Sequence, residues 1–208
     1  KARLKFVKCV FFLISMETTI NIKDEHEKVR EHCGLFPLDA WCLVQATGKD
    51  IFTYFQTQTT NNVLQLEEGQ GQNSAIVDRK ARLIASFSIH RNGDHSVIFL
   101  LESQLKETFL KHLDSYLFRE DVHVQPLNDS LLALQGPKSA LILENLVQEI
   151  SVPEKLNSIG SFNYQGNDVV IINKSLTGEE GYILACDPSQ KESLIAGFEQ
   201  ADDKWVPV

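Results

Sequence analysis

Apolar and polar positions along the chain follow two different periods. A repeat of three to four residues, the period of an amphipathic helix, is clearest over 104–117. Its apolar face carries Leu105, Phe109, Leu113, Tyr116 and Leu117. A more charged stretch predicts a surface helix over 24–33, and Gly34 stands where a helix commonly ends.

Three further helices are predicted from residues that favour helix starts. Asp50 offers a side-chain oxygen that can cap a short helix running through Phe55. Gly136-Pro137 opens another, because proline in the first turn gives up an N–H that has no partner there. Ser189 and Glu192 have the spacing of a capping box, which predicts a helix near the C-terminal end.

Alternation with a period of two predicts strands between these helices. Two tight turns, Asn92-Gly93-Asp94 and Gln165-Gly166-Asn167, join neighbouring strands into hairpins. The predicted strands are 41–46, 72–78, 82–91, 95–101, 122–126, 130–135, 162–164, 169–173 and 181–186. Hairpins interleaved with helices are typical of an α+β fold with mostly antiparallel sheets and flanking helices.

The two ends of the chain leave several interpretations open. Residues 1–8 are basic, and 9–14 is an apolar run too short to span a bilayer, so no membrane partner is expected. Residues 1–16 are interpreted as a leader, as sequence upstream of a native start at Met16, or as a first strand. The apolar ending 205–208 predicts a truncated C-terminus.

Composition excludes some classes of function. The 28 acidic residues outnumber the 20 basic ones, which gives a formal net charge of −8. Nucleic acid is therefore not an expected partner, because binding it normally needs a clustered basic face. The four cysteines have no Cys-x-x-Cys spacing, so we expect reduced thiols in a cytosolic-type compartment and no disulfide framework.

Known site motifs are incomplete or absent in this sequence. None of the six histidines forms a His-x-x-x-His pair, and no metal site is predicted. His90 and His95 flank a hairpin turn, where we expect them to be exposed. Gly69-x-Gly71-x-x-Ser74 is a dinucleotide-binding fingerprint without its third glycine, and we interpret it as a turn between strands.

Three segments, in this order, resemble the aminomethyltransferase (glycine-cleavage T-protein) superfamily. The first consists of Gly34-Leu35-Phe36-Pro37-Leu38-Asp39, Gly48-Lys49-Asp50 and Thr60-Asn61-Asn62-Val63. The second is Asp78-Arg79-Lys80-Ala81-Arg82, followed by Leu132-Ala133-Leu134-Gln135-Gly136-Pro137. The third is Thr177-Gly178-Glu179-Glu180-Gly181-Tyr182. Leu38-Asp39-x-Trp41 is more similar to the folate-binding iron–sulfur-cluster maturation branch, whereas the third segment is more similar to the transferases.

The resemblance implies a folate-binding fold without the C-terminal barrel of longer members. It implies a discontinuous host domain, 17–46 with 146–208, and an inserted α+β domain, 47–145. Tetrahydrofolate is the implied cofactor, and the implied partners are reduced folate with iron–sulfur proteins or a lipoyl carrier protein. The implied compartment is the cytoplasm, or the mitochondrial matrix in a eukaryote.

Two departures from the transferases bear on activity. In transferases a carboxylate lies against the reacting nitrogen of folate, and the matching positions here are Ile84 and Ala85. A glutamate that accepts hydrogen bonds from the pterin is matched by Ile183. A positioned acid or base supplies about 10²- to 10⁴-fold in rate, so we expect no catalytic residue and no active aminomethyltransferase. The alternation of Ala85, Phe87 and Ile89 also fits one buried face of a strand.

The resemblance also implies a set of folate contacts: Thr60, Asn61, Asn62, Glu102, Glu179 and Tyr182. Glu179 or Glu102 could replace the missing pterin acceptor, or either could be a surface carboxylate. Glu179 could equally anchor its own loop, and the two asparagines could simply end a helix. The leading hypothesis is a folate-binding protein without transferase activity, in iron–sulfur protein maturation or one-carbon regulation. The alternatives are an aminomethyltransferase of the glycine cleavage system and an interaction scaffold with a vestigial pocket.

Overall fold

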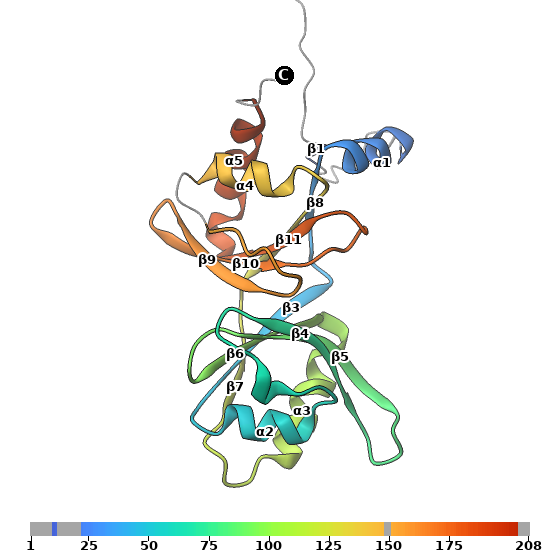
Figure 1. Cartoon of the computed structure of the whole chain (residues 1–208), viewed down its shortest axis with the longest axis vertical. Helices are drawn as coiled ribbons and strands as arrows, with labels where there is room; N and C mark the ends of the chain where they lie inside the picture. The colour runs from blue at the N-terminus through green and yellow to red at the C-terminus, as the bar shows by residue number, and fades with distance from the viewer. Residues whose placement is uncertain (1–9, 12–21, 148–150, 204–208) are drawn as a thin grey trace, which may run out of the picture. The chain divides into compact units, whose positions relative to one another are not determined.

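The computed structural model describes residues 10–11, 22–147 and 151–203, which divide into two compact units. The described part of unit 1 consists of 10–11, 22–38, 130–147, 151–152 and 161–203. Unit 2 consists of 39–129 and 153–160. The chain therefore leaves unit 1 and returns to it twice (Figure 1). The division into a host of 17–46 with 146–208 and an insert of 47–145 stays a prediction.

Unit 1 is built on a six-stranded sheet with the order β1-β2-β8-β11-β10-β9. Its strands are β1 (Val10–Phe11), β2 (Gly34–Pro37), β8 (Ser130–Gln135), β9 (Ile159–Tyr164), β10 (Asn167–Asn173) and β11 (Gly181–Cys186). β1 runs parallel to β2, whereas the β2–β8, β8–β11 and β10–β11 pairs are antiparallel. The remainder of the predicted leader or first strand lies outside the described residues.

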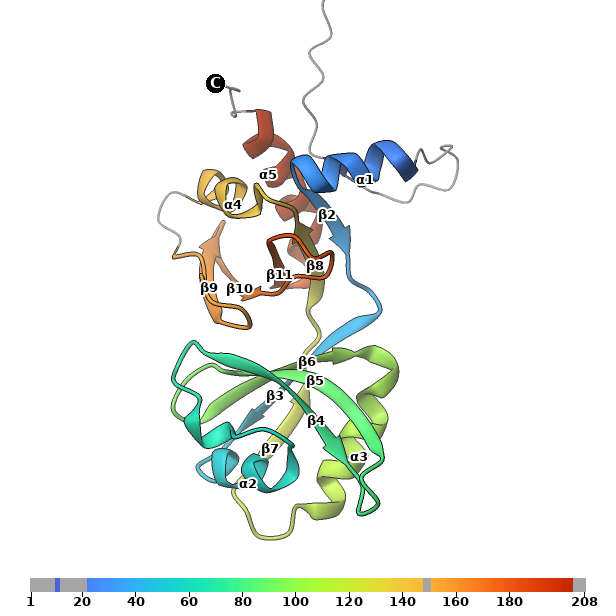
Figure 2. The same ribbon diagram turned by 45° about the vertical axis from the view of Figure 1, so that its right-hand side comes forward.

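One face of this sheet is covered by two helices, α4 (Ser139–Leu146) and α5 (Lys191–Asp203), as Figure 2 shows. Their apolar residues Ile142, Leu143, Leu194 and Phe198 join alternate strand residues in one core. Those strand residues include Leu132, Leu134, Val169, Ile171, Tyr182 and Leu184. The strand alternation seen in the sequence therefore selects the face that packs against α4 and α5.

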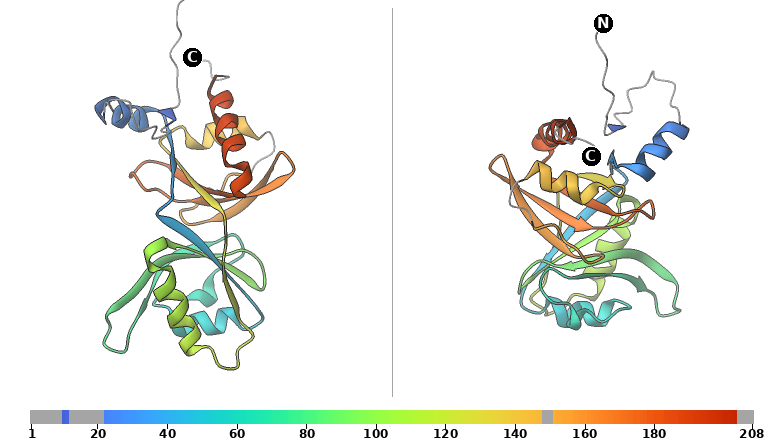
Figure 3. Two further views of the ribbon diagram at one scale, coloured as in Figure 1. Left: turned by 180° about the vertical axis from the view of Figure 1, so that it is seen from behind. Right: turned by 45° about the horizontal axis from the view of Figure 1, so that its top comes forward.

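Unit 2 contains a five-stranded sheet with the order β4-β5-β6-β3-β7, and each strand pair is antiparallel. Its strands are β3 (Trp41–Thr47), β4 (Gly71–Val77), β5 (Leu83–Arg91), β6 (Ser96–Glu102) and β7 (His123–Pro126). Helices α2 (Ile51–Gln58) and α3 (Lys106–Tyr116) lie on one face of it (Figure 3). Between them and the sheet, Phe55, Phe87, Phe99 and Phe109 form a cluster with ring centroids 4.8–5.3 Å apart.

The fold class predicted from the sequence is confirmed, since two mostly antiparallel sheets carry flanking helices. The described residues form these two units and no barrel domain. In this described part of the chain, no helix is both long and apolar enough to cross a membrane.

The details of three helix ends differ from the prediction. Helix α1 (Ile22–Glu31) ends before Gly34, which opens strand β2 and does not cap the helix. Asp50 precedes α2 but makes no cap bond, because its carboxylate accepts the backbone N–H of Asp121 at 2.8 Å. Asp187, and not Ser189, caps the turn before α5. Its carboxylate accepts both the backbone N–H and the hydroxyl of Ser189.

The start of α4 also differs in a small way from the prediction. Pro137 lies two positions before the first residue of α4, Ser139, and so precedes the helix. The hydroxyl of Ser139 donates to the carbonyl of Gly136, which fixes the turn between β8 and α4.

Candidate functional site

Strand β5 of unit 2 contains both positions that match the missing transferase carboxylate. Ala85, Phe87 and Ile89 are buried in the core of unit 2, as the alternation predicted. Ile76 of β4 lies opposite Ala85, and the next residue, Val77, lies opposite Leu83. Ile84 is therefore the extra residue of a β-bulge, and such a bulge lets two successive side chains turn to the same side.

Ile84 and Ala85 both pack in or against the core of unit 2. Ala85 is fully buried, and Ile84 packs against the same cluster as a partly buried side chain. Neither residue can carry a proton.

We call the face of the sheet opposite α2 and α3 the second face. After the bulge, Ser86 is the first residue of β5 on this face. Alternation along β5 puts Ser86, Ser88 and His90 on this face, and alternation along β6 puts Glu102 there. Ser86 is exposed, and Glu102 is partly exposed, paired across the strands with Trp41 and hydrogen-bonded by the side-chain amide of Gln104.

Sequence reasoning did not single out Ser86. The signal was available, since Ser86 is the polar residue between two buried ones, but only the bulge shows that Ile84 does not share its face.

The prediction that His90 is exposed was wrong. His90 is fully buried, its Nδ1 donates to the carbonyl of Asn157 at 2.8 Å, and its Nε2 lies 3.0 Å from the hydroxyl of Ser88. A carbonyl can only accept, so Nδ1 carries a proton in this contact. The cause is the segment 153–160, distant in sequence, which packs on unit 2.

The two glycines of the incomplete dinucleotide motif make room for this segment. A Cβ on Gly71 would lie 2.3 Å from the carbonyl oxygen of Asn157 and 2.4 Å from Nδ1 of His90. Gly69 has φ of +79° and accepts the backbone N–H of Ile159 at 2.8 Å. Gly69 lies in a turn, whereas Gly71 and Ser74 belong to strand β4, and the element before the turn is the 3-10 helix Val63–Gln65, so the predicted turn between two strands is only partly correct. The two glycines allow a close approach of two backbones.

The segment Thr60 to Asn62 follows α2 and lies along strand β4, which is an edge strand. The N–H of Thr60 donates to the carbonyl of Ala75, and the hydroxyl of Thr60 accepts from the N–H of Ala75. The side-chain amide of Asn61 donates to the carbonyl of Asn73 at 2.6 Å. Two of these three predicted folate contacts are thus bound to the edge of the sheet, and all three are exposed.

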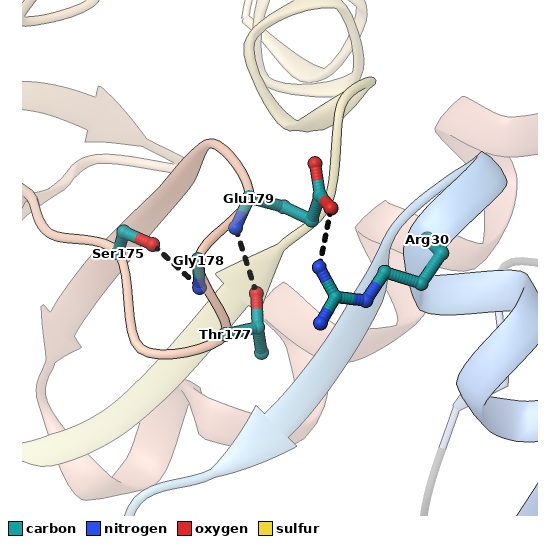
Figure 4. Close-up of polar contacts among 5 residues, drawn as sticks. All are labelled: Arg30, Ser175, Thr177, Gly178 and Glu179. Atoms are coloured by element: carbon teal, nitrogen blue, oxygen red, sulfur yellow. Dashed lines mark hydrogen bonds and ion pairs between the residues drawn. The ribbon is translucent and has the colours of Figure 1, made fainter.

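The Thr-Gly-Glu loop, residues 174–181 of unit 1, is held at several points (Figure 4). Glu179 forms an ion pair with Arg30 of α1 at 2.6 Å, and its backbone N–H donates to the hydroxyl of Thr177. The N–H of Gly178 donates to the hydroxyl of Ser175. The carboxylate of Glu179 therefore takes part in fixing its own loop, which is one of the three roles considered for it.

The buried side chain of Gln135 supports the base of the same loop. Its amide nitrogen donates to the carbonyl of Lys174, and its amide oxygen accepts the N–H of Leu176 at 2.7 Å. A Cβ on Gly181 would lie within 2.4 Å of this amide, so Gly181 is required for the contact. Burial lowers the pKa of Lys174, whose backbone this amide holds.

Tyr182 and Ile183 face opposite sides of β11. Tyr182 belongs to the core beneath α4 and α5, and its hydroxyl donates to a carboxylate oxygen of Glu180 at 2.9 Å. Ile183 faces the other way and is paired with Ala133 and Ile172 of the neighbouring strands. All three are nearly fully buried, so the position that matches the pterin acceptor lies in an apolar row.

The predicted folate contacts thus fall into two groups. Thr60, Asn61, Asn62 and Glu102 belong to unit 2, and Glu179 and Tyr182 belong to unit 1. No group of three or more metal-ligating side chains occurs among the residues the structure describes. Of the cysteines there, Cys33 and Cys186 are buried, and burial raises the pKa of Cys42.

Two solved structures have a similar fold. The aminomethyltransferase T of the glycine cleavage system from Bartonella henselae matches with a TM-score of 0.75 at 22% identity, over 84% of this chain and 47% of that one. The heterotetrameric sarcosine oxidase from Corynebacterium sp. U-96 matches with a TM-score of 0.60 at 18% identity, over 88% of this chain and 92% of that one. These likenesses define the fold class.

The family follows from the sequence comparison. The family model described as the GCVT N-terminal domain matches residues 6–205, and the chain belongs to this family. Proteins named aminomethyltransferase from Bacillus subtilis and Thermus thermophilus are 28% and 24% identical to it. The matches cover 80% and 93% of this chain but 46% and 56% of those relatives, so the chain spans about half their length. The superfamily resemblance predicted from the three motifs is confirmed.

Proposed function

We propose that this chain forms the folate-binding part of a protein that binds reduced folate without catalysing aminomethyl transfer. The observation that carries the proposal is the placement of Ile84 and Ala85 in the core of unit 2. The resemblance implies that transferases have their carboxylate at these two positions. In this chain both side chains are hydrocarbons and cannot donate or accept a proton. Losing a positioned acid or base lowers a rate by about 10²- to 10⁴-fold.

The apolar row around Ile183 supports weaker recognition of the pterin edge. A buried donor that loses its acceptor costs about 1–3 kcal/mol, which is roughly ten- to a hundredfold in affinity. Glu179 is engaged with Arg30, and Glu102 on the second face of unit 2 is the carboxylate that we propose as a folate contact. The proposed contact set in unit 2 is Thr60, Asn61, Asn62 and Glu102. In unit 1, the predicted contacts Glu179 and Tyr182 are engaged with Arg30 and Glu180, and we leave them out of the proposed set.

The proposed biological role is iron–sulfur protein maturation or regulation of one-carbon metabolism, in the cytoplasm or the mitochondrial matrix. It is supported by the similarity of Leu38-Asp39-x-Trp41 to the maturation branch. The competing role is that of an aminomethyltransferase with a lipoyl carrier protein, which the names of the relatives favour. The chain spans about half of those relatives, so the activity of the whole protein is itself part of the proposal.

Isothermal titration calorimetry with tetrahydrofolate, up to millimolar concentration, tests the proposal. We expect saturable binding and a rise in melting temperature, and we expect Glu102→Gln to weaken the affinity by roughly tenfold. Glu107→Gln is the matched control, because Glu107 is an exposed carboxylate on α3 and its replacement removes the same charge. Absence of both heat and thermal shift would refute folate binding.

A second assay separates the proposal from the enzyme alternative. Glycine cleavage with the lipoyl carrier protein should give no turnover above background with this chain. Turnover at the rate of a transferase would overturn the non-transferase part of the proposal while leaving folate binding intact.

A further inference from the structure

The turn between strands β4 and β5 carries a cluster of basic residues in an acidic chain. Residues 78–82 contain three cations and one carboxylate, whereas the whole chain has a formal net charge of −8. This hairpin extends beyond the rest of unit 2 in Figure 1 and in the left panel of Figure 3. Arg79 and Lys80 at its tip are exposed.

The carboxylate of Asp78 fixes the conformation of this turn. One oxygen of Asp78 accepts the N–H groups of Lys80 and Arg82 at 2.8 and 3.0 Å, and the other pairs with the guanidinium of Arg82 at 2.6 Å. The N–H of Arg82 lowers the pKa of Asp78 most, followed by its side chain, so the carboxylate stays ionised. Arg79 and Lys80 are therefore presented on a preorganised backbone, which reduces the ordering cost of binding.

Two apolar residues, Val77 and Leu83, flank the basic turn at the ends of strands β4 and β5. Val77 and Leu83 are paired across the strands and are 39% and 63% exposed. The β-bulge accounts for this exposure, because Ile84 turns into the core and Leu83 is left outside. Single exposed apolar residues are ordinary on a protein surface, but here a cross-strand pair adjoins two cations on a projecting, rigid turn.

We propose that this hairpin docks an acidic surface of a protein partner, with Arg79 and Lys80 facing carboxylates and Val77 and Leu83 covering a small apolar contact. Nucleic acid is a poorer fit, because two cations outside an internal ion pair make few phosphate contacts and the chain as a whole repels a polyanion. An anionic membrane is a poorer fit for the same charge reason, and two apolar side chains bury little area in a bilayer. This inference is independent of the proposed folate function.

Fluorescence anisotropy with short labelled probes tests the docking surface on the full chain. The probes are a peptide that alternates glutamate and leucine, a polyglutamate of equal length, a short DNA duplex and phosphatidylglycerol vesicles. The variants are Arg79→Glu with Lys80→Glu, and separately Leu83→Ser. Lys111→Glu with Lys155→Glu is the control, because it reverses two charges at exposed positions elsewhere in unit 2.

We expect the alternating peptide to bind the native chain and the control, and to lose roughly tenfold in affinity with the hairpin charge variant. Leu83→Ser should weaken the alternating peptide and leave polyglutamate unchanged. Equal loss in the control variant, no binding of the alternating peptide, or tighter binding of DNA or vesicles would each overturn the proposal. All the altered side chains are exposed, so thermal melting should show folded variants.

Discussion

Replacing Ala85 with aspartate puts a carboxylate at one of the two positions where a transferase is expected to have one. Ala85 is fully buried among apolar residues of unit 2, so the new carboxylate is surrounded by apolar side chains and shielded from solvent. Such a group remains protonated when buried, because desolvation disfavours the charged form. Ser86→Asp is the matched variant, since Ser86 is the next residue, is exposed, and faces the other side of the same strand.

The cost of Ala85→Asp follows from the protonation equilibrium. An unfolded aspartate has a pKa of about 3.9, so keeping it neutral at pH 7 costs about 4 kcal/mol at about 1.4 kcal/mol per pH unit. That is a large part of the 5–15 kcal/mol typical of a folded domain. The folded pKa is raised, so the folded state holds the extra proton and stability falls as pH rises above 3.9. Between pH 5 and pH 7.5 the variant should lose about 3 kcal/mol relative to the native chain.

Urea unfolding followed by circular dichroism at several pH values measures this difference. Ser86→Asp should stay within about 0.5 kcal/mol of the native chain throughout the range. If Ala85→Asp were as stable as Ser86→Asp and equally insensitive to pH, position 85 would be reached by solvent. Burial in the core of unit 2 would then not explain why position 85 carries no carboxylate.

Four other substitutions test local contacts and backbone conformations in the two units. Gly71→Ala should destabilise the chain by about 2–4 kcal/mol in urea unfolding, because the new Cβ would overlap the carbonyl of Asn157 and the imidazole of His90. A loss below about 1 kcal/mol would mean that the segment 153–160 does not pack against Gly71. Arg30→Ala should cost less than about 1 kcal/mol in urea unfolding, since its ion pair is half-exposed. Gln135→Ala should cost about 1–3 kcal/mol, because it removes a buried side chain and its two hydrogen bonds to the backbone of Lys174 and Leu176. A larger loss for Arg30→Ala than for Gln135→Ala would contradict the roles given to these two residues. Ala81→Gly should raise the melting temperature slightly, because Ala81 has φ of +57° and glycine accepts that conformation without strain; a lower melting temperature would contradict it.

Much of the local structure could be predicted from the sequence. The periods of two and of three to four residues fix which elements form, since a strand or helix that buries one face must repeat its apolar residues at that period. The strand β11 at 181–186 and the turn at Gln165-Gly166 agree with the prediction, and Gln165 and Gly166 both have positive φ as a tight hairpin requires. The three motifs also sufficed to identify the family.

Helix ends were predicted less well, because a capping side chain often has competing partners. Asp50 was assigned to cap α2 from its position alone, but the N–H of Asp121, distant in sequence, takes its carboxylate. A sequence shows which side chains can cap a helix, and the tertiary structure determines which one is available.

The amino-acid sequence by itself determined most helices and strands, their apolar faces and the absence of an acidic residue at positions 84, 85 and 183. Only the tertiary structure decided which side chain of β5 faces which way, because a single extra residue in the β4–β5 ladder turns Ile84 into the core and leaves Ser86 on the second face. It also decided the burial of His90, since the segment that covers it lies 67 residues further along the chain. Local periodicity reports contacts within an element, whereas bulges and covering segments depend on neighbours that only folding brings together.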